Sequence, residues 1–329
     1  MGTILERTRK YSQLKKHLED KFTKHQPRTT QETGGQPPIW EAEKFNLEAI
    51  RSNKEKITRC QRHVVLFEDA NGNQMDFVYF GAWNDEEFNR LKEHNSKAMN
   101  VKAFHRGKRV GKLGEGIMQG FGARVPKGGS KYGDGYRYFE GAEISTQGNI
   151  FEGINDFFNH AEDALKMEET ARSVNSKLVR NIQASSKDCQ KVGRFGANLY
   201  RCRNYMAGMH RESDAGPGLC CQLEWNAERK FDEFAFIYLQ YGVYIATEPN
   251  TLWSFNANEV HGTMLPSHSS VLRLRGGYDL RPRYEQAVAV TTGAHLTTRK
   301  KDAKRAKEHA RMERCHRLRV DTMAGNFDS

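Results

Sequence analysis

The sequence predicts an α+β fold, in which helices surround an antiparallel β core, and three observations support this prediction. Residues 150–183 place apolar side chains at the spacing of an amphipathic helix. Residues 63–83 read as two strands around an Asn71-Gly72 turn. Beyond residue 196, six short β-rich segments are separated by turns, which favours an antiparallel sandwich or barrel: NLYRCRNYMAGMH, LCCQLEWN, FDEFAFIYLQYGVYIATEP, TLWSFNANEVHG, SSVLRLRGG and RYEQAVAVTTG.

Further helices are expected at both ends of the chain and after the hairpin. Residues 1–26 carry Lys/Glu pairs at helical spacing and predict an N-terminal helix. Residues 84–99 predict a helix capped by Asn84 or Asp85, since short polar side chains satisfy the first backbone N–H groups. A basic helix is expected over residues 298–318.

These elements suggest four regions along the chain. A stretch rich in Pro, Gly and Thr follows the first helix and reads as a linker. The β-rich texture begins near residue 196 and ends before the basic segment. The expected regions are an N-terminal helix and linker (1–39), a part with the hairpin, a Gly-rich loop and supporting helices (40–195), the β core (196–297), and a basic helix and tail (298–329).

Composition narrows the class of protein. The chain has 329 residues and a mean hydropathy of −0.80, and it contains no run of 18 apolar residues, so no membrane span is expected. The charged N-terminus lacks the apolar stretch of a secretory signal. The six cysteines show no CxxC spacing, which argues against a zinc ribbon or a disulfide framework and favours a reducing, intracellular compartment.

Positive charge is concentrated near the C-terminus. Residues 299–320 hold ten Lys/Arg and three acids, so this segment supplies +7 of the net charge of +11. Such a segment attracts polyanions, because each neutralised phosphate releases counterions. Contact with nucleic acid is one interpretation; a solvated basic helix or a nuclear localisation signal is the other.

Residues 106–136 are dense in glycine but do not form a known phosphate loop. The GxxxxGK[ST] pattern is absent, and GEGIMQG has the wrong spacing for GxGxxG. We interpret the segment as a long loop, whose Lys and Arg side chains could lie against a nucleic-acid backbone.

The pattern that carries chemistry is His210-Arg211-Glu212. Fe(II) in many oxygenases is held by two histidines and one carboxylate, which leaves positions for a keto acid and O₂. Alternate residues of a strand point the same way, so His210 and Glu212 could converge on one metal ion. His261, 51 residues later, is placed to supply the second imidazole. An arginine on the last strand would pair with the far carboxylate of the keto acid.

Several assignments stay open on the residues alone. A His-x-acid pair is common by chance, so the alternative is that His210 and Glu212 are ordinary exposed polar residues at the end of a strand. Asp214 lies on the same strand face and competes with Glu212 as the carboxylate ligand. Arg273 and Arg275, in VLRLRGG, compete with the arginine that opens RYEQAVAV.

The segments MHRES, LCCQLEW, WSFNANEVHGTMLP and RYEQAVAV together resemble the TET/JBP group of Fe(II)/2-oxoglutarate dioxygenases, and its fungal, transposon-associated branch most of all. The resemblance covers residues 195–293, with weaker likeness over 63–140, and VHGTMLP is its most specific part. It implies a double-stranded β-helix (jelly-roll) core flanked by helices. It also implies iron ligation by His210, Glu212 and His261 and binding of 2-oxoglutarate by Arg283. The family usually has Asp where this chain has Glu212, whose side chain reaches one methylene further.

The resemblance further implies oxidation of the methyl group of a modified DNA base, 5-methylcytosine to 5-hydroxymethylcytosine and beyond, with N6-methyladenine as another candidate base. Fe(II), 2-oxoglutarate and O₂ would be required, and the target base would flip out of the duplex. A nuclear monomer is expected. Two other functions fit parts of the sequence: a 2-oxoglutarate-dependent hydroxylase of a protein or small molecule, and an inactive relative that binds nucleic acid.

Overall fold

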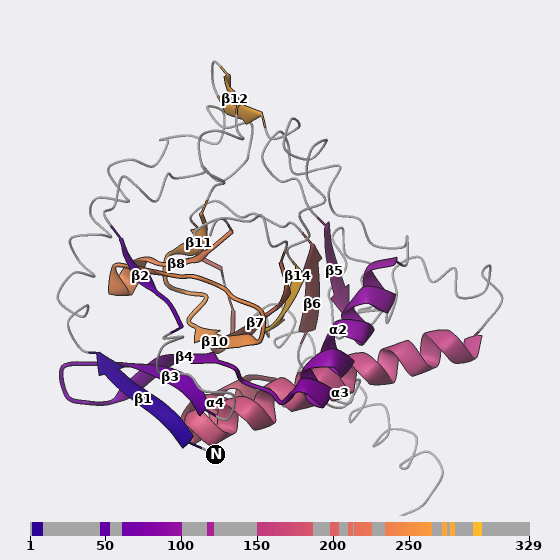
Figure 1. Ribbon diagram of the computed structural model, residues 1–329, viewed down its shortest axis with the longest axis horizontal. Coiled ribbons are helices and arrows are strands. Elements are labelled where there is room, and N and C mark those ends of the chain that lie inside the picture. The colour runs from indigo at the N-terminus through magenta and orange to yellow at the C-terminus, as the bar shows by residue number, and fades with distance from the viewer. Residues whose placement is uncertain are drawn as a thin grey trace, which may run out of the picture.

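A computed structural model describes the chain over the following residues, and every structural statement below refers to them: 2–8, 47–52, 61–100, 117–121, 150–186, 198–203, 210–212, 214–225, 234–264, 272–274, 277–279 and 292–297. Helices and strands are both present, and Figure 1 shows the helices on one side of the strands. The predicted α+β class is therefore confirmed.

Most of the strands belong to two sheets. The larger has eight strands, in the order β1 (Gly2–Thr8), β3 (Gln61–Glu68), β4 (Gln74–Phe80), β10 (Thr251–Phe255), β7 (Gly218–Glu224), β14 (Thr292–Thr297), β6 (Asn198–Arg203) and β5 (Ile117–Phe121). The smaller has four, in the order β11 (His261–Thr263), β8 (Phe236–Tyr238), β9 (Val243–Ile245) and β2 (Glu48–Ile50). A short 3₁₀ helix, η6 (Leu239–Tyr241), joins β8 to β9.

Successive segments alternate between the two sheets. The chain passes from β6 in the larger sheet to His210, which pairs with β11 of the smaller sheet, and then back to β7. It continues through β8 and β9 in the smaller sheet, β10 in the larger, β11 in the smaller and β14 in the larger. Residues far apart in sequence are therefore brought side by side within each sheet.

The two sheets enclose an apolar core. On β10, Trp253 and Phe255 face this core, while Leu252 belongs to a separate cluster on the opposite face, as strand alternation requires. The core between the sheets contains Val65, Phe67, Val78, Phe80, Cys220, Phe236, Tyr238, Tyr241, Val243, Ile245, Trp253, Phe255 and Ala257.

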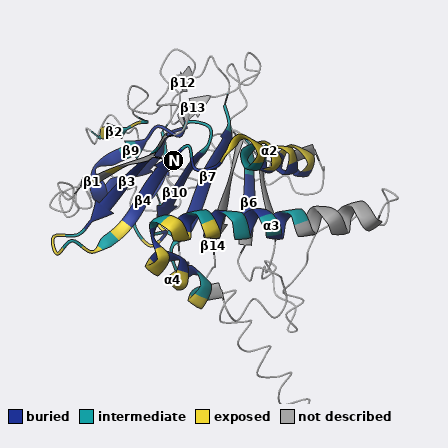
Figure 2. Ribbon diagram, turned by 60° about the horizontal axis from the view of Figure 1, so that its bottom comes forward, coloured by how far each residue is buried: buried dark blue, intermediate teal, exposed yellow. Residues whose placement is uncertain are grey.

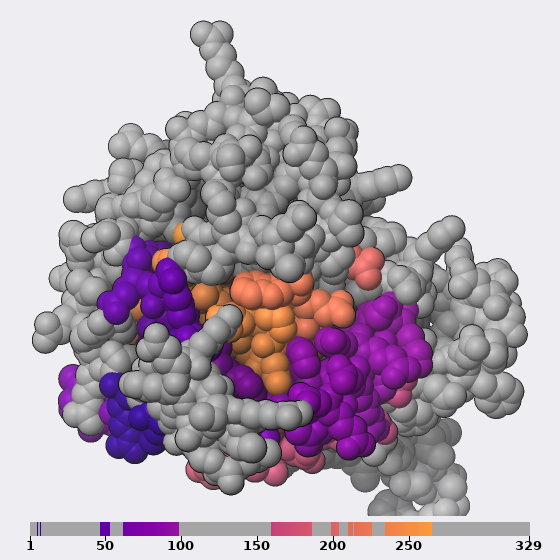
Figure 3. All heavy atoms as spheres, viewed as in Figure 1, coloured from indigo at the N-terminus to yellow at the C-terminus, as the bar shows by residue number. Residues whose placement is uncertain are grey.

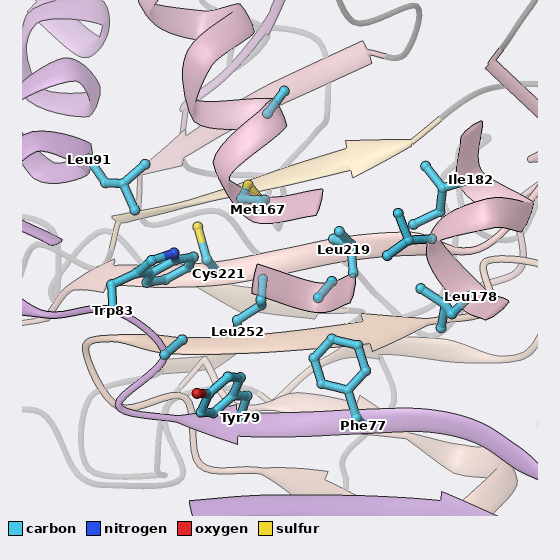
Figure 4. Packing of buried hydrophobic residues seen from close by; sticks show 14 of the residues in the cluster. Phe77, Tyr79, Trp83, Leu91, Met167, Leu178, Ile182, Leu219, Cys221 and Leu252 are labelled. Carbon is cyan, nitrogen blue, oxygen red and sulfur yellow. The ribbon is translucent and has the colours of Figure 1, made fainter. Parts of the chain in front are cut away.

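The helices cover the outer face of the larger sheet. They are α2 (Asp85–Asn100), α3 (Ile150–Val174) and α4 (Ser176–Ser186), and Figure 2 shows α3 running across the strands. Leu219, Cys221 and Leu252 point from the sheet towards Met167 of α3 and Ile182 of α4 (Figure 4). Burial of these side chains fixes the helices on the sheet.

Capping residues set the ends of the helices. The Asn84 side-chain oxygen accepts the Glu87 backbone N–H at 2.9 Å, so Asn84 is the cap of α2, one of the two residues predicted. The helical structure predicted over 150–183 is confirmed, except that the chain breaks at Asn175 into two helices. The Asn175 side-chain oxygen accepts the Leu178 backbone N–H at 2.9 Å and starts α4 as a separate helix.

Two further expectations are corrected by strands at the edges of the larger sheet. Gly2–Thr8, expected to be helical, is β1 and pairs in parallel with β3. Ile117–Phe121, expected to belong to a loop, is β5 and pairs with β6. In both cases the partner strand is distant in sequence, and its otherwise exposed N–H and C=O groups supply the hydrogen bonds. Patterns of neighbouring residues do not predict such pairing. Residues 9–26, and the rest of the glycine-dense segment, lie outside the described residues.

The predicted hairpin is confirmed. Strands β3 and β4 pair antiparallel, and Gly72 has a φ of +82°, a conformation that suits glycine. The Asp69 side chain accepts the backbone N–H groups of Asn71 and Asn73, each at 2.8 Å, and closes the turn. Through β4 the hairpin joins β10 and so becomes part of the larger sheet.

The basic helix expected over 298–318 and the linker over 26–39 lie outside the described residues. Among the helices that the structure does describe, none has the length and apolar character needed to cross a membrane.

Candidate metal centre

His210 and His261 lie side by side because their backbones pair. The His210 N–H donates to the His261 carbonyl at 2.9 Å, and the His261 N–H donates to the His210 carbonyl at 3.0 Å. Two residues that exchange both bonds face each other across an antiparallel pair, with side chains on the same face. Their imidazole centroids are 4.6 Å apart. The predicted convergence of these two histidines is therefore present in the structure.

Glu212 lies next to His210, although His210 forms only an isolated β-bridge and residues 211 and 212 belong to no strand. Its Oε1 is 3.7 Å from His210 Nε2, and both side chains are partly exposed. The Glu212 backbone N–H donates to the Ala257 carbonyl at 2.7 Å, which ties this segment to the turn before β11. The intervening Arg211 is exposed.

A second contact orients the imidazole of His261. Its Nδ1 is 2.9 Å from the Glu259 carbonyl oxygen. A carbonyl oxygen can only accept, so Nδ1 carries the proton and Nε2 keeps its lone pair. Metal-binding histidines commonly have this arrangement, in which the outer ring nitrogen is held by a carbonyl or carboxylate. His261 is buried and also packs on the rings of Phe236 and Phe255, with centroid distances of 5.8 and 5.2 Å.

Asp214, the alternative carboxylate, has a different environment. It is fully buried, whereas Glu212 is partly exposed beside His210. The Asp214 backbone carbonyl accepts a hydrogen bond from the Asn258 side chain at 3.3 Å, so this segment is also held to the turn before β11. For Glu212 the structure shows a contact with His210.

The turn over residues 256–260 is itself held by a tyrosine inside the core. The Tyr238 hydroxyl accepts the Asn256 backbone N–H at 2.8 Å and donates to the buried Asp76 carboxylate. Asp76 also accepts from Tyr241 at 2.6 Å, and from Ser254 at 3.0 Å. This network could not be predicted from the sequence, because a single Asp within an apolar strand is indistinguishable from a surface residue until the sheets close over it.

Burial raises the pKa of the Asp76 carboxyl to about 6. Loss of solvation is the main cause, and the charge of Glu259 acts in the same direction. Hydrogen bonds from Tyr241, Tyr238 and Ser254 favour the carboxylate and oppose the rise. The Asp76 carboxyl therefore holds its proton to a higher pH than an exposed carboxyl does.

The donor set suits Fe(II) in its chemistry, since two imidazoles and a carboxylate with open positions are typical of oxygenase iron. The 3.7 Å contact between His210 and Glu212 is close to the separation of two ligands that share one metal ion. Within the described residues, however, no three His, Cys, Asp or Glu side chains are gathered closely enough to hold a metal ion together. His210 contacts the His261 ring and the Glu212 carboxylate.

The arginine expected to bind 2-oxoglutarate is not placed. Arg283 and Arg275 lie outside the described residues. Arg273 is in β12 (Leu272–Leu274), which pairs with β13 (Gly277–Asp279) in a separate two-stranded sheet, with β12 set apart from the core in Figure 1. The expected strand RYEQAVAVTTG also lies mostly outside these residues, and β14 begins at Thr292.

Of the aromatic residues that the sequence offers for stacking on a base, several are core residues. Tyr238, Tyr241 and Trp253 are buried between the sheets. Trp225 is partly exposed just after β7, and the remaining candidates, Tyr136, Tyr138 and Phe139, lie outside the described residues. On the face seen in Figure 3, the 234–264 region is visible between β2 and α2.

A second polar cluster lies on the helical side of the larger sheet. Arg201 of β6 is buried and contacts the Asp163 carboxylate and His160 Nδ1. His94 lies 2.7 Å from the same carboxylate group. Burial and the Arg201 charge hold the pKa of His160 well below its usual value, so His160 accepts a hydrogen bond as a neutral ring. This cluster joins the helices to the sheet and is on the opposite face of it from the core between the sheets.

Comparisons with known proteins give only a slight likeness. No family model matches the chain, and no curated protein matches it. Among solved structures, NgTET1 in complex with 5mC DNA has a TM-score of 0.45 at 9% identity over 78% of this chain and 83% of that one. A prolyl hydroxylase from Trichoplax adhaerens, in complex with a peptide fragment of hypoxia inducible factor, has a TM-score of 0.38 at 9% identity, covering 70% and 86%. A prolyl-4-hydroxylase from Pseudomonas putida has a TM-score of 0.35 at 9% identity, covering 68% and 91%. Because these TM-scores are below 0.5, the functional argument rests on the chain's own residues.

Proposed function

We propose that this chain is an Fe(II)/2-oxoglutarate-dependent dioxygenase with a double-stranded β-helix core. The observation that carries the proposal is the backbone pairing of His210 with His261, which places two imidazoles together beside Glu212. The alternation of successive strands between two facing sheets supports the jelly-roll core, since it is the arrangement that a rolled-up Greek key produces.

In this proposal His210, Glu212 and His261 hold the iron, and Arg283 binds the far carboxylate of 2-oxoglutarate. When bound, the iron would supply the activation of O₂ that oxidises a C–H bond. His261 would ligate through Nε2, because Nδ1 donates to the Glu259 carbonyl. The Phe236 and Phe255 rings that pack on His261 would keep bulk water from its buried side.

The proposed substrate is the methyl group of a modified DNA base, with 5-methylcytosine oxidised to 5-hydroxymethylcytosine and further. The support is the concentration of positive charge in residues 299–320, which suits a phosphate backbone, together with the resemblance of the HRE and VHGTMLP segments to the TET/JBP group. A nuclear location follows from the same substrate. The enzyme would have to act on a base flipped out of the duplex, since a paired base cannot reach a buried metal.

Metal binding tests the site directly. We expect the full chain to bind one Fe(II) under anaerobic conditions, measured by equilibrium dialysis and metal analysis. His210→Ala, Glu212→Ala and His261→Ala should each weaken binding by about tenfold or more, because each removes a ligand. Arg211→Ala is the matched control, since it changes the exposed residue between two ligands. Asp214→Asn tests which of the two carboxylates binds iron. If Asp214→Asn loses iron while Glu212→Ala retains it, the ligand is Asp214.

Turnover tests the substrate. Succinate release from 2-oxoglutarate would be measured with Fe(II), O₂ and duplex DNA that carries 5-methylcytosine, N6-methyladenine or no modification. We expect stimulation by the 5-methylcytosine duplex and its loss in His261→Ala. Stimulation by the N6-methyladenine duplex alone would mean that the substrate base is N6-methyladenine and not 5-methylcytosine. Iron binding without stimulation by any DNA would favour a protein or small-molecule substrate, and failure to bind iron would leave the inactive nucleic-acid-binding relative.

A further inference from the structure

The turn over residues 256–260 is tied to two of the candidate iron ligands. It leads directly into His261, and the Glu259 carbonyl oxygen lies 2.9 Å from Nδ1 of that histidine. On its other side, the Glu212 backbone N–H donates to the Ala257 carbonyl at 2.7 Å. A shift of this turn would therefore move His261 and Glu212 together.

The two ends of this turn are fixed in different ways. At its end, the Leu239 backbone N–H donates to the Val260 carbonyl at 3.3 Å. At its start, the Asn256 backbone N–H donates to the Tyr238 hydroxyl at 2.8 Å. Asn256 directly follows β10, so this bond sets the point at which the chain leaves the larger sheet. A side chain therefore holds the backbone at the beginning of the turn.

Tyr238 is itself firmly placed. Its backbone lies opposite His261 in the pair of β8 with β11, and its side chain is completely buried. Its hydroxyl donates to the buried Asp76 carboxylate of β4, in the larger sheet. Burial raises the pKa of the Tyr238 hydroxyl well above its usual value, so the hydroxyl keeps the proton that it donates. Donation to a carboxylate also makes the hydroxyl oxygen a better acceptor for the Asn256 N–H.

We propose that the Tyr238 hydroxyl is a positioning group for the iron site, which holds the 256–260 turn so that His261 and Glu212 converge on one metal ion. The inference rests on the proposed function and assigns a residue that acts through the turn and not by touching iron or substrate. Groups that orient metal ligands from outside the coordination sphere commonly change metal affinity when they are removed.

Tyr238→Phe and Tyr241→Phe form a matched pair of variants. Each keeps the aromatic ring and removes one hydroxyl that donates to Asp76, but only Tyr238→Phe also removes the acceptor of the Asn256 N–H. Dissociation constants for Fe(II) would be measured by equilibrium dialysis on the folded full chain under anaerobic conditions. We expect Tyr238→Phe to weaken Fe(II) binding about tenfold and Tyr241→Phe to bind Fe(II) as the wild type does.

The visible absorption spectrum of the Co(II)-loaded chain is the second readout, because it reports the geometry of the ligands and not the stability of the fold. We expect the bands of Tyr238→Phe to differ from those of the wild type in position or intensity. The bands of Tyr241→Phe should match those of the wild type. A hydroxyl that only stabilised the fold would leave both spectra unchanged.

Each result has a defined meaning. Equal weakening of Fe(II) binding in the two variants would mean that the hydrogen bonds to Asp76 only stabilise the fold, and it would overturn the positioning role. Unchanged Fe(II) affinity in Tyr238→Phe, or an unchanged Co(II) spectrum, would also overturn that role and leave the proposed function intact. A wild-type chain that binds no Fe(II) would overturn the proposed function, and the inference with it.

Hydrogen exchange in the wild-type chain covers the case in which Tyr238→Phe does not fold. Coupling is reciprocal, so a hydrogen bond that favours metal binding is itself favoured by bound metal. Exchange would be followed by NMR on the ¹⁵N-labelled chain, with and without diamagnetic Zn(II). We expect Zn(II) to slow exchange of the Asn256 N–H more than that of the Asn250 N–H, which donates to the Gln222 carbonyl at the other end of β10. Equal slowing of the two amides, or slowing of neither, overturns the proposal.

Discussion

Replacing Asp76 with asparagine should remove a pH dependence of stability that the buried carboxyl creates. Asp76 lies between the sheets and accepts hydrogen bonds from Tyr241, Ser254 and, at 3.4 Å, the Gln240 side chain. Burial is the main cause that raises its pKa from 3.8 to about 6. Asp76→Asn keeps the shape of the side chain and cannot titrate.

The sign and size of the effect follow from proton linkage. A carboxyl with a higher pKa in the folded chain holds its proton more tightly there than in the unfolded chain. Its contribution to stability is therefore greatest below pH 3.8 and is lost as the pH rises through about 6. Since one pKa unit corresponds to about 1.4 kcal/mol, the loss amounts to about 3 kcal/mol. The Glu259 charge moves the pKa of Asp76 in the same direction as burial.

Urea unfolding of the metal-free chain, followed by circular dichroism between pH 4 and pH 7.5, measures this effect. The quantity of interest is the free energy of unfolding of the wild type minus that of Asp76→Asn, because other titrating groups cancel in this difference. We expect it to fall by about 2–3 kcal/mol across the range. Ser254→Ala, which keeps the carboxyl, should retain the dependence. A difference that is constant or that increases with pH would refute the reasoning.

Three other substitutions test the packing of helices on the larger sheet, each by urea unfolding at neutral pH. Arg201→Ala leaves the buried Asp163 carboxylate without its guanidinium and should cost about 3–5 kcal/mol; a cost below 1 kcal/mol would mean that the ion pair is dispensable. Leu219→Ala opens a cavity between β7 and the helices and should cost about 2–5 kcal/mol, with Leu5→Ala, at an exposed position, as the neutral control. Asn84→Ala removes the cap of α2 and should cost about 1 kcal/mol, whereas Asn84→Asp, which still caps, should cost little.

Local sequence patterns predicted the parts of the fold whose hydrogen bonds join residues that are close together in the sequence. The Asn71-Gly72 turn and the helix after Asn84 are closed by residues within a few positions of each other, and both are present. The break at Asn175 also has a local cause, the side-chain cap of α4, but it was hidden within a continuous apolar periodicity. Strand β1 could not be predicted, because its partner is the edge of β3, about sixty residues away.

For the candidate site too, the sequence predicted some features and the tertiary structure decided others. The sequence by itself predicted His210, Glu212 and His261 as candidate ligands, because a short His-x-Glu spacing and a distant histidine are visible as patterns of residue type. Only the tertiary structure brought His210 and His261 into one backbone pair and assigned the proton of His261 to Nδ1. The environment of Asp76 was also decided there: the sequence shows an acid in an apolar strand, and only the closing of two sheets determines that its carboxyl loses its solvent.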